Sequence, residues 1–141
     1  MSAKKPGIAI LAAEFNKPLM AVMISTAKQT AAELGAEVRL EVTVPGSYEL
    51  PLVARKAIVR SEIDAVVVLG YIERGETQHG EVMGHVVHAA LVNLSLAHLK
   101  PVAFGVIGPG ATPEQAETRK EAYAAAAVRA AMRALEAGAH L

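Results

Sequence analysis

The chain has 141 residues and no cysteine, so it is long enough for one domain with a proper core and cannot form a disulfide. Lys and Arg total 14, as do Asp and Glu, without a basic or acidic block, which argues against nucleic acid or an anionic membrane surface as a partner. Aromatic residues make up only 4%. Ala, Val, Leu and Ile must therefore carry the core, which suits closely packed helices and parallel strands.

The first apolar run, residues 7–13, admits two interpretations. It follows a lysine pair and so resembles a secretory signal peptide, but it has only the minimum length for one, and Glu14 follows at once. We interpret it as a buried strand. No run approaches the roughly 18 apolar residues that span a bilayer. Together with the missing cysteines, these features favour a cytoplasmic protein without a membrane segment.

Four apolar runs of strand length alternate with four helical patterns along the chain. The strands are expected at residues 7–14, 37–44, 64–71 and 101–107, and the helices at about 18–34, 48–61, 79–99 and 113–137. Strict alternation of strand and helix is typical of parallel strands joined by right-handed crossovers. The sequence thus predicts one α/β domain over residues 1–141. We expect a three-layer sandwich with a four-stranded parallel, flavodoxin-like sheet and helices on both faces.

Helix-terminating residues support these boundaries. Gly35 is expected to close the first helix, and Ser47 to cap the second. Thr112-Pro113-Glu114-Gln115 has the pattern of a capping box with proline at the first helical position. Gly138 is expected to end the last helix.

Unusual residues cluster where the predicted strands end. In a doubly wound sheet, ligands bind beyond the carboxyl ends of the strands, so these loops are expected to build one pocket. They contribute Phe15-Asn16, Pro45-Gly46-Ser47-Tyr48-Glu49, the loop from Gly70 to His79, and Phe104 with Gly108-Pro109-Gly110.

The loop from Gly70 to His79 carries the strongest signal for chemistry. It follows an apolar strand and brings a hydroxyl, Thr77, and an imidazole, His79, to the start of a helix. Backbone N–H groups at a helix N-terminus favour an anion, and a histidine beside them can move protons. The alternative is an ordinary strand-to-helix turn with a capping Thr77 and a solvated His79.

Five motifs in order resemble the lumazine synthase family, most closely its short archaeal form. They are Glu14-Phe15-Asn16, Val44 to Pro51, Leu69-Gly70 with Gly75 to His79, Pro101 to Gly105, and Glu114-Gln115-Ala116 with Arg119. They span about residues 7 to 137. The resemblance implies an enzyme of riboflavin biosynthesis that condenses 5-amino-6-(D-ribitylamino)uracil with 3,4-dihydroxy-2-butanone 4-phosphate. The products are 6,7-dimethyl-8-ribityllumazine, phosphate and water, and the family uses no metal and no cofactor.

The resemblance also implies roles for single residues. His79 is expected to transfer protons, and Phe15 to stack on the pyrimidine ring, although Phe15 could instead close the core. The other expected substrate-binding residues are Asn16, Gly46, Ser47, Tyr48, Glu49, Tyr71, Ile72 and Phe104. Asn16 and Glu49 could serve equally as helix caps.

The phosphate is expected to lie on Gly75, Glu76 and Thr77 and to contact Arg119. In the family that arginine, like the residue that Phe104 resembles, comes from the neighbouring subunit. Arg119 could otherwise be an ordinary exposed helical arginine. The resemblance implies a homopentamer with active sites at subunit interfaces. Single pentamers, paired pentamers and a sixty-subunit icosahedral shell are left open.

Three alternatives accompany this interpretation. His85 and His88, with Glu81 on the same helical stripe, have a spacing that could bind a metal, but a polar helix face is the preferred reading. The chain could be an archaeal-type riboflavin synthase, which consumes the lumazine. It could also be a shell or carrier protein built on the same pentamer with weak activity.

Overall fold

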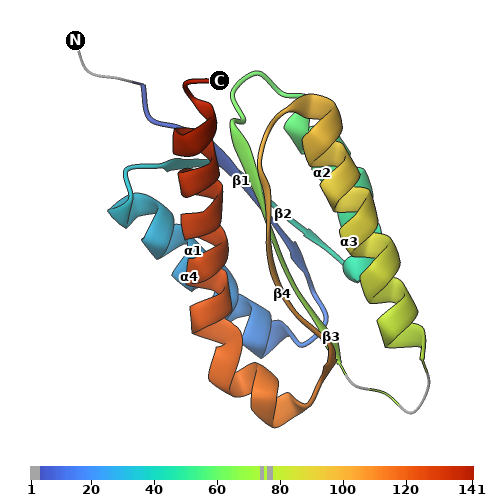
Figure 1. Cartoon of the computed structure of the whole chain (residues 1–141). Helices are drawn as coiled ribbons and strands as arrows, with labels where there is room; N and C mark the ends of the chain where they lie inside the picture. Colours follow the sequence, from blue (N-terminus) through green and yellow to red (C-terminus); the bar gives the residue numbers. More distant parts are fainter. Residues whose placement is uncertain (1–3, 74, 76–77) are drawn as a thin grey trace.

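The computed structural model describes residues 4–73, 75 and 78–141 (Figure 1). Within it, a sheet of four strands has the order β2-β1-β3-β4. These strands are β1 (Gly7–Ala13), β2 (Glu37–Val44), β3 (Ala65–Glu73) and β4 (Val102–Ala111). Every pairing is parallel. The central strands are buried along their length, except for Glu73 at the end of β3, because both of their faces are covered.

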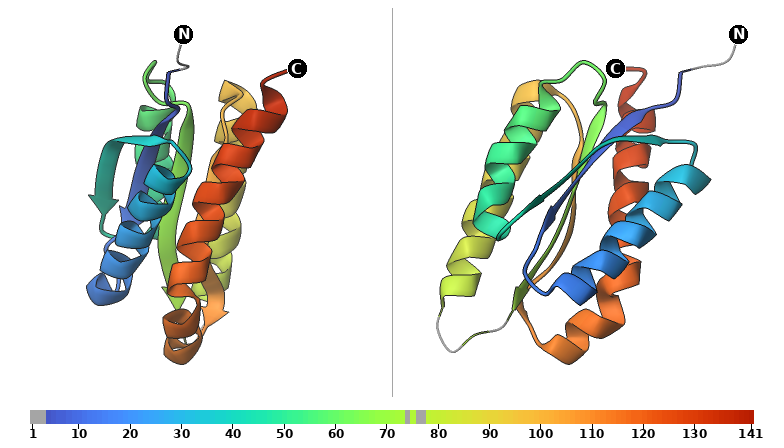
Figure 2. Two further views of the ribbon diagram at one scale, coloured as in Figure 1. Left: turned by 90° about the vertical axis from the view of Figure 1, so that its left-hand side faces the viewer. Right: turned by 180° about the vertical axis from the view of Figure 1, so that it is seen from behind.

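Two pairs of helices enclose this sheet. On one face lie α1 (Lys17–Glu33) and α4 (Pro113–Gly138), and on the other lie α2 (Leu50–Ile58) and α3 (His79–His98), as Figures 1 and 2 show. The predicted three-layer α/β sandwich is therefore confirmed. Within the described ranges, no helix is long and apolar enough to cross a membrane.

The core has two halves, one on each face of the sheet. Ile8 and Ile10 of β1 pack among the buried residues of α1 and α4, whereas Ala9 and Leu11 pack among those of α2 and α3. Side chains of a strand point alternately to its two faces. One apolar strand thus supplies both halves of the core.

Most of the predicted helix ends are confirmed. Asn16 caps α1 in a left-handed conformation, φ 59°, and its Oδ1 accepts the N–H of Leu19 at 3.3 Å. Gly35 follows α1 with φ 78°. Thr112 and Gln115 exchange hydrogen bonds at the start of α4, where each side chain accepts the backbone N–H of the other. This is the predicted capping box.

The expectation for the second helix was wrong in two respects. Residues Ser47–Glu49 form a 3₁₀ turn, η1, and α2 then runs only from Leu50 to Ile58. Ser47 does not cap it, because its side chain is buried and its hydroxyl lies against Gly70. The carboxylate of Glu49 instead accepts the N–H of Gly46 at 2.9 Å and so caps the 3₁₀ turn, whereas α2 has no side-chain cap.

The fourth strand is longer than predicted, and this moves Phe104 away from the expected rim. Gly108 and Gly110 adopt φ 97° and 89°, and after this irregular segment the pairing with β3 resumes at Ala111. The segment therefore continues the strand instead of ending it. Phe104 pairs with Val68, which lies halfway along β3, and is the third residue of β4. Its predicted place at the carboxyl end was wrong.

Candidate functional site

A cavity of about 340 Å³ lies at the carboxyl ends of β1, β2 and β3, on the side of the sheet that α3 covers. Loops after these strands and the first turn of α3 form its walls. The lining residues are Phe15, Pro45, Gly46, Tyr71, Ile72, Glu73, Gly75, His79, Gly80 and Met83. Ligand sites in sheets of this kind occur at this edge, and their volumes begin near this size.

Phe15 supplies the cavity with an aromatic wall. It lies two residues after the end of β1 and precedes the left-handed Asn16, so the chain turns sharply after it. The side chain is 47% exposed, and its ring centroid lies 5.8 Å from that of Tyr71. A flat, half-exposed ring at a cavity wall offers a stacking surface for a planar heterocycle.

His79 is the first residue of α3 and lies in the same cavity. Gly75, from the loop before α3, is also part of the wall. Glu76 and Thr77, which were expected to hold phosphate, lie outside the described residues. An imidazole beside an aromatic wall and a helix N-terminus can move protons next to a bound anion.

The segment after β2 contributes less to the cavity than expected. Gly46 lines it, whereas Ser47, Tyr48 and Glu49 do not. Ser47 is buried, Tyr48 is 54% exposed, and Glu49 holds the N–H of Gly46. Asn16 likewise engages its side chain with the start of α1. Asn16 and Glu49 thus have the capping roles that their positions also allowed.

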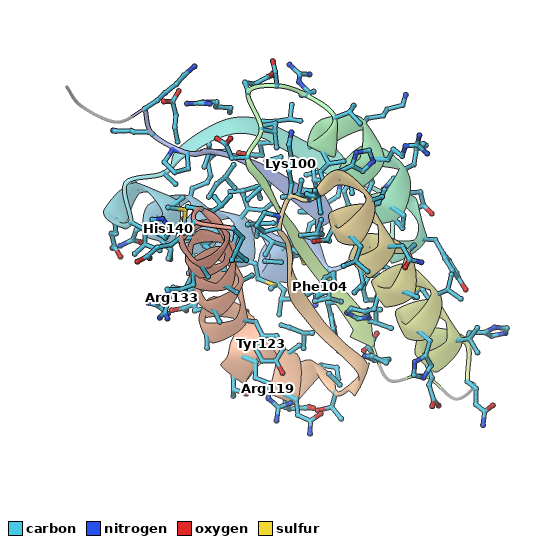
Figure 3. All side chains as sticks on the ribbon, turned by 45° about the horizontal axis from the view of Figure 1, so that its top comes forward. Lys100, Phe104, Arg119, Tyr123, Arg133 and His140 are labelled. Carbon is cyan, nitrogen blue, oxygen red and sulfur yellow. The ribbon has the colours of Figure 1, made fainter. Side chains whose placement is uncertain are left out.

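Two further expected site residues do not line the cavity of their own chain. Arg119 is exposed on α4, which covers the opposite face of the sheet, and Figure 3 shows it near Tyr123. Phe104 is on β4, an edge strand, where its ring meets that of His88 with centroids 5.2 Å apart. Both therefore lie away from the cavity that contains His79.

Met83, Gly80, Glu73 and Pro45 line the cavity without having been predicted as site residues. Met83 had a signal in the sequence, because residues four apart on a helix share a face and His79 is four residues earlier. Glu73 belongs to the loop from Gly70 to His79 that was expected to build the pocket, but it had no assigned role there. It lies in the wall because β3 extends to that residue.

A second hollow of about 380 Å³ adjoins the first and shares Glu73, Gly75 and Gly80 with it. Its remaining walls include Glu81 and His85 and contain neither phenylalanine nor tyrosine. Both hollows contain the carboxylate of Glu73, but this one adds that of Glu81, which repels an anionic phosphate, and it lacks the rings of Phe15 and Tyr71 that suit a heterocycle. We therefore take the cavity of Phe15 and His79 as the candidate site.

His85 and His88 have different partners in the structure. The Nε2 atom of His85 is 3.7 Å from the carboxylate of Glu81, and both side chains are largely exposed. Nδ1 of His88 donates to the carbonyl of Gly84 at 2.7 Å. Among the described residues, no group of three or more His, Cys, Asp or Glu could hold a metal ion.

Residues 5–139 match the family model for 6,7-dimethyl-8-ribityllumazine synthase. The protein of that name from Metallosphaera sedula is 44% identical over 126 residues, which are 89% of this chain and 83% of the relative. Its namesake from Saccharolobus islandicus is 40% identical over 136 residues, 96% of this chain and 88% of the relative. A third, from Pyrobaculum arsenaticum, is 41% identical over 126 residues, 89% and 84% of the two chains.

Fold and cavity together define a doubly wound α/β protein with a cavity at the carboxyl edge of its sheet, where proteins of this class bind small molecules. The chain belongs to the 6,7-dimethyl-8-ribityllumazine synthase family. The resemblance seen in its motifs is thereby confirmed over nearly the whole chain, and the relatives are archaeal, as the short form implied.

Proposed function

We propose that this protein condenses 5-amino-6-(D-ribitylamino)uracil with 3,4-dihydroxy-2-butanone 4-phosphate to give 6,7-dimethyl-8-ribityllumazine, phosphate and water. The observation that carries this proposal is the meeting of Phe15 and His79 in one cavity, in a chain of this family. Phe15 stacks on the pyrimidine ring, and His79 lies where the two substrates react. No step needs a cofactor.

Positioning accounts for the larger part of the proposed rate enhancement. An amine and a ketone already react with each other in water, so holding them in contact raises the rate by raising their effective concentration. Phe15 orients the pyrimidine, and the start of α3 faces the phosphate of the second substrate. Amine and ketone are then held together in the cavity, whose lining also includes Ile72 and Gly75.

His79 provides the proton transfers of the reaction. The amine loses protons as the imine forms, the departing oxygen of the ketone gains them, and ring closure requires a further exchange. An imidazole can both accept and donate a proton in water near neutral pH. Because the background reaction is easy, the gain from His79 is on the order of 10² or less, at the low end for general acid–base groups.

The proposal includes a homopentamer in which one subunit supplies His79 and its neighbour supplies Arg119 and Phe104. Two observations support it. Arg119 and Phe104 lie away from the cavity of their own chain, and α3 exposes a row of apolar side chains. These are Val82, Val86, Val92 and Leu96. Exposed apolar rows of this kind mark contact surfaces.

Absorbance of the lumazine tests the activity when both substrates are mixed with the protein. We expect product to form faster than in buffer alone. An equal rate in buffer would contradict the proposal, and riboflavin formation from added lumazine would favour a riboflavin synthase. The cytoplasmic location expected from the sequence belongs to the same proposal and is tested by cell fractionation.

A further inference from the structure

Behind the exposed ring of Phe15 lies a second aromatic ring, that of Tyr71. Their centroids are 5.8 Å apart and the ring planes meet at 44° (tilted), a separation at which aromatic pairs attract each other. Phe15 is 47% exposed, whereas Tyr71 is only 3% exposed. Tyr71 therefore offers a ligand almost no surface of its own, although it stands in the cavity wall.

Tyr71 is itself fixed at both ends. Its ring belongs to the core between the sheet and the helices α1 and α4, and its hydroxyl donates to the carbonyl of Ala111 at 3.2 Å. Burial, followed by the charges of Glu73 and Glu114, raises the pKa of the phenol. The group thus keeps its proton and remains a donor at neutral pH.

Phe15, by contrast, is only partly buried. It follows the end of β1 and precedes the left-handed turn at Asn16, and about half of its surface faces solvent. A half-exposed side chain can adopt more than one rotamer, and a ligand that stacks on it must restrict that freedom. A ring that is already held does not impose this cost on binding.

We propose that Tyr71 is a positioning residue, which holds the ring of Phe15 in the orientation that stacks on the pyrimidine substrate. This inference rests on the proposed function for the identity of the ligand. It assigns to Tyr71 an effect on pyrimidine binding that acts through Phe15 and not through direct contact. The aromatic ring is responsible for this effect, because its burial in the core is sufficient to hold it in place without the hydroxyl.

The test is a double-mutant cycle on the KM of the pyrimidine substrate, built from Tyr71→Leu and Phe15→Leu. Tyr71→Leu alone should raise this KM about twofold to tenfold, the range that aromatic pairs are worth. In the Phe15→Leu background it should raise it no further, because the ring on which Tyr71 acts is gone. Equal effects in both backgrounds would show a merely structural role and overturn the proposal.

Two variants separate the ring from the hydroxyl and from loss of volume. Tyr71→Phe keeps the ring and should retain the wild-type KM. Tyr71→Met fills much of the space without a ring and should behave like Tyr71→Leu. If both ring-deleting variants fail to fold, Tyr71→Phe still provides a test. A twofold to tenfold rise in the pyrimidine KM of Tyr71→Phe would assign the effect to the hydroxyl and contradict the proposal.

The KM of the phosphate-bearing substrate serves as an internal control. It should stay within about twofold of the wild-type value in Tyr71→Leu, since the stacking contact orients the pyrimidine alone. A parallel rise in both KM values would indicate general damage to the cavity and count against positioning by Tyr71.

The failure of this inference can be told apart from failure of the proposed function. The wild-type protein is assayed first for lumazine formation, and its failure would remove the proposed activity. The dissociation constant of the pyrimidine alone would then be measured for the same four proteins of the cycle, by titration monitored through the absorbance or fluorescence of the pyrimidine. Non-additivity in those dissociation constants would support the role of Tyr71, and additivity would refute it.

Discussion

Phe15 gives the cavity an aromatic wall because it lies two residues after β1 and packs against a buried ring. The pairing of β1 with β3 thus brings Phe15 to Tyr71, and Phe15 in turn orients the ligand in the proposed site. His79 is placed in the same wall by a different route, as the first residue of α3. The two residues are far apart in the sequence but belong to one site.

Replacing Phe15 by alanine should weaken pyrimidine binding. The heterocycle loses its stacking surface, worth about 1 kcal/mol or somewhat more, so the KM should rise roughly fivefold. Phe15→Tyr, which keeps the aromatic face, is the matched control and should preserve the KM. An unchanged KM for the pyrimidine in Phe15→Ala would remove this side chain from the site.

Replacing His79 by alanine should lower kcat by about 10²-fold or less and leave assembly intact. Its side chain is exposed in the first turn of α3, so its loss removes no core contact. His85→Ala is the matched control, because it deletes an exposed imidazole of the same helix that faces the adjoining hollow. Full activity in a folded His79→Ala protein would assign proton transfer to another group.

At the scale of the elements, α3 ends in an unusual way. Leu99 closes this helix in the left-handed region, φ 54°, and its side chain is 90% exposed. A left-handed conformation costs a residue with a Cβ roughly 1–2 kcal/mol, and glycine is the usual residue at this position. The exposed leucine has no packing contact that offsets this cost within the chain.

Leu99→Gly should therefore stabilise the protein by about 0.5–1 kcal/mol, once the greater freedom of glycine in the unfolded chain is subtracted. Chemical denaturation at one fixed protomer concentration measures this change. Ala97→Gly is the control, since it places glycine at an exposed position inside the helix, outside the apolar row, and should destabilise by about 1 kcal/mol. A loss of stability in Leu99→Gly would mean that the leucine side chain makes a contact in the assembled protein.

At the scale of the whole molecule, one chain presents only part of the proposed site. Its cavity contains Phe15 and His79, whereas Arg119 projects from the helix layer on the other face of the sheet (Figure 3). In a closed ring of identical subunits, Arg119 of each subunit can reach the cavity of one neighbour, while its own cavity receives Arg119 from the other neighbour.

Mixed rings of two impaired variants should then recover part of the activity. His79→Ala and Arg119→Ala each damage every site when present alone. When the two variants are mixed in equal amounts, a site is intact if one subunit supplies an unmutated His79 and its neighbour an unmutated Arg119. Random assembly gives each condition a chance of about one half, so roughly one quarter of sites are intact. The measurement is the rate of purified mixed oligomers carrying two different tags.

The control for this experiment is a mixed ring of two differently tagged His79→Ala chains, which should show no recovery. Arg119→Ala alone should chiefly raise the KM for the phosphate-bearing substrate, because it removes a charge-assisted contact. No recovery in verified mixed rings would place both residues in one subunit or remove Arg119 from the site. Sedimentation measures the ring itself, and a stable monomer would refute the pentamer.

The sequence by itself determined the class of fold and the edge of the sheet where the site lies. The apolar periodicity of the segments and the order of strands and helices along the chain suffice for this, because apolar strands that alternate with helices allow few topologies. The caps at Asn16 and Thr112 were equally readable, since they depend on contacts within three residues. The family was readable too, because five collinear motifs carry it.

Only the tertiary structure decided which side chains meet. Ser47 was predicted as a cap but is buried against Gly70, and Phe104 was expected at the rim but pairs with Val68. The support of Phe15 by Tyr71 was likewise hidden. These outcomes depend on strand register and on contacts between residues far apart in the chain. A local pattern does not encode such contacts, because register and packing are settled by the whole sheet and its two helix layers.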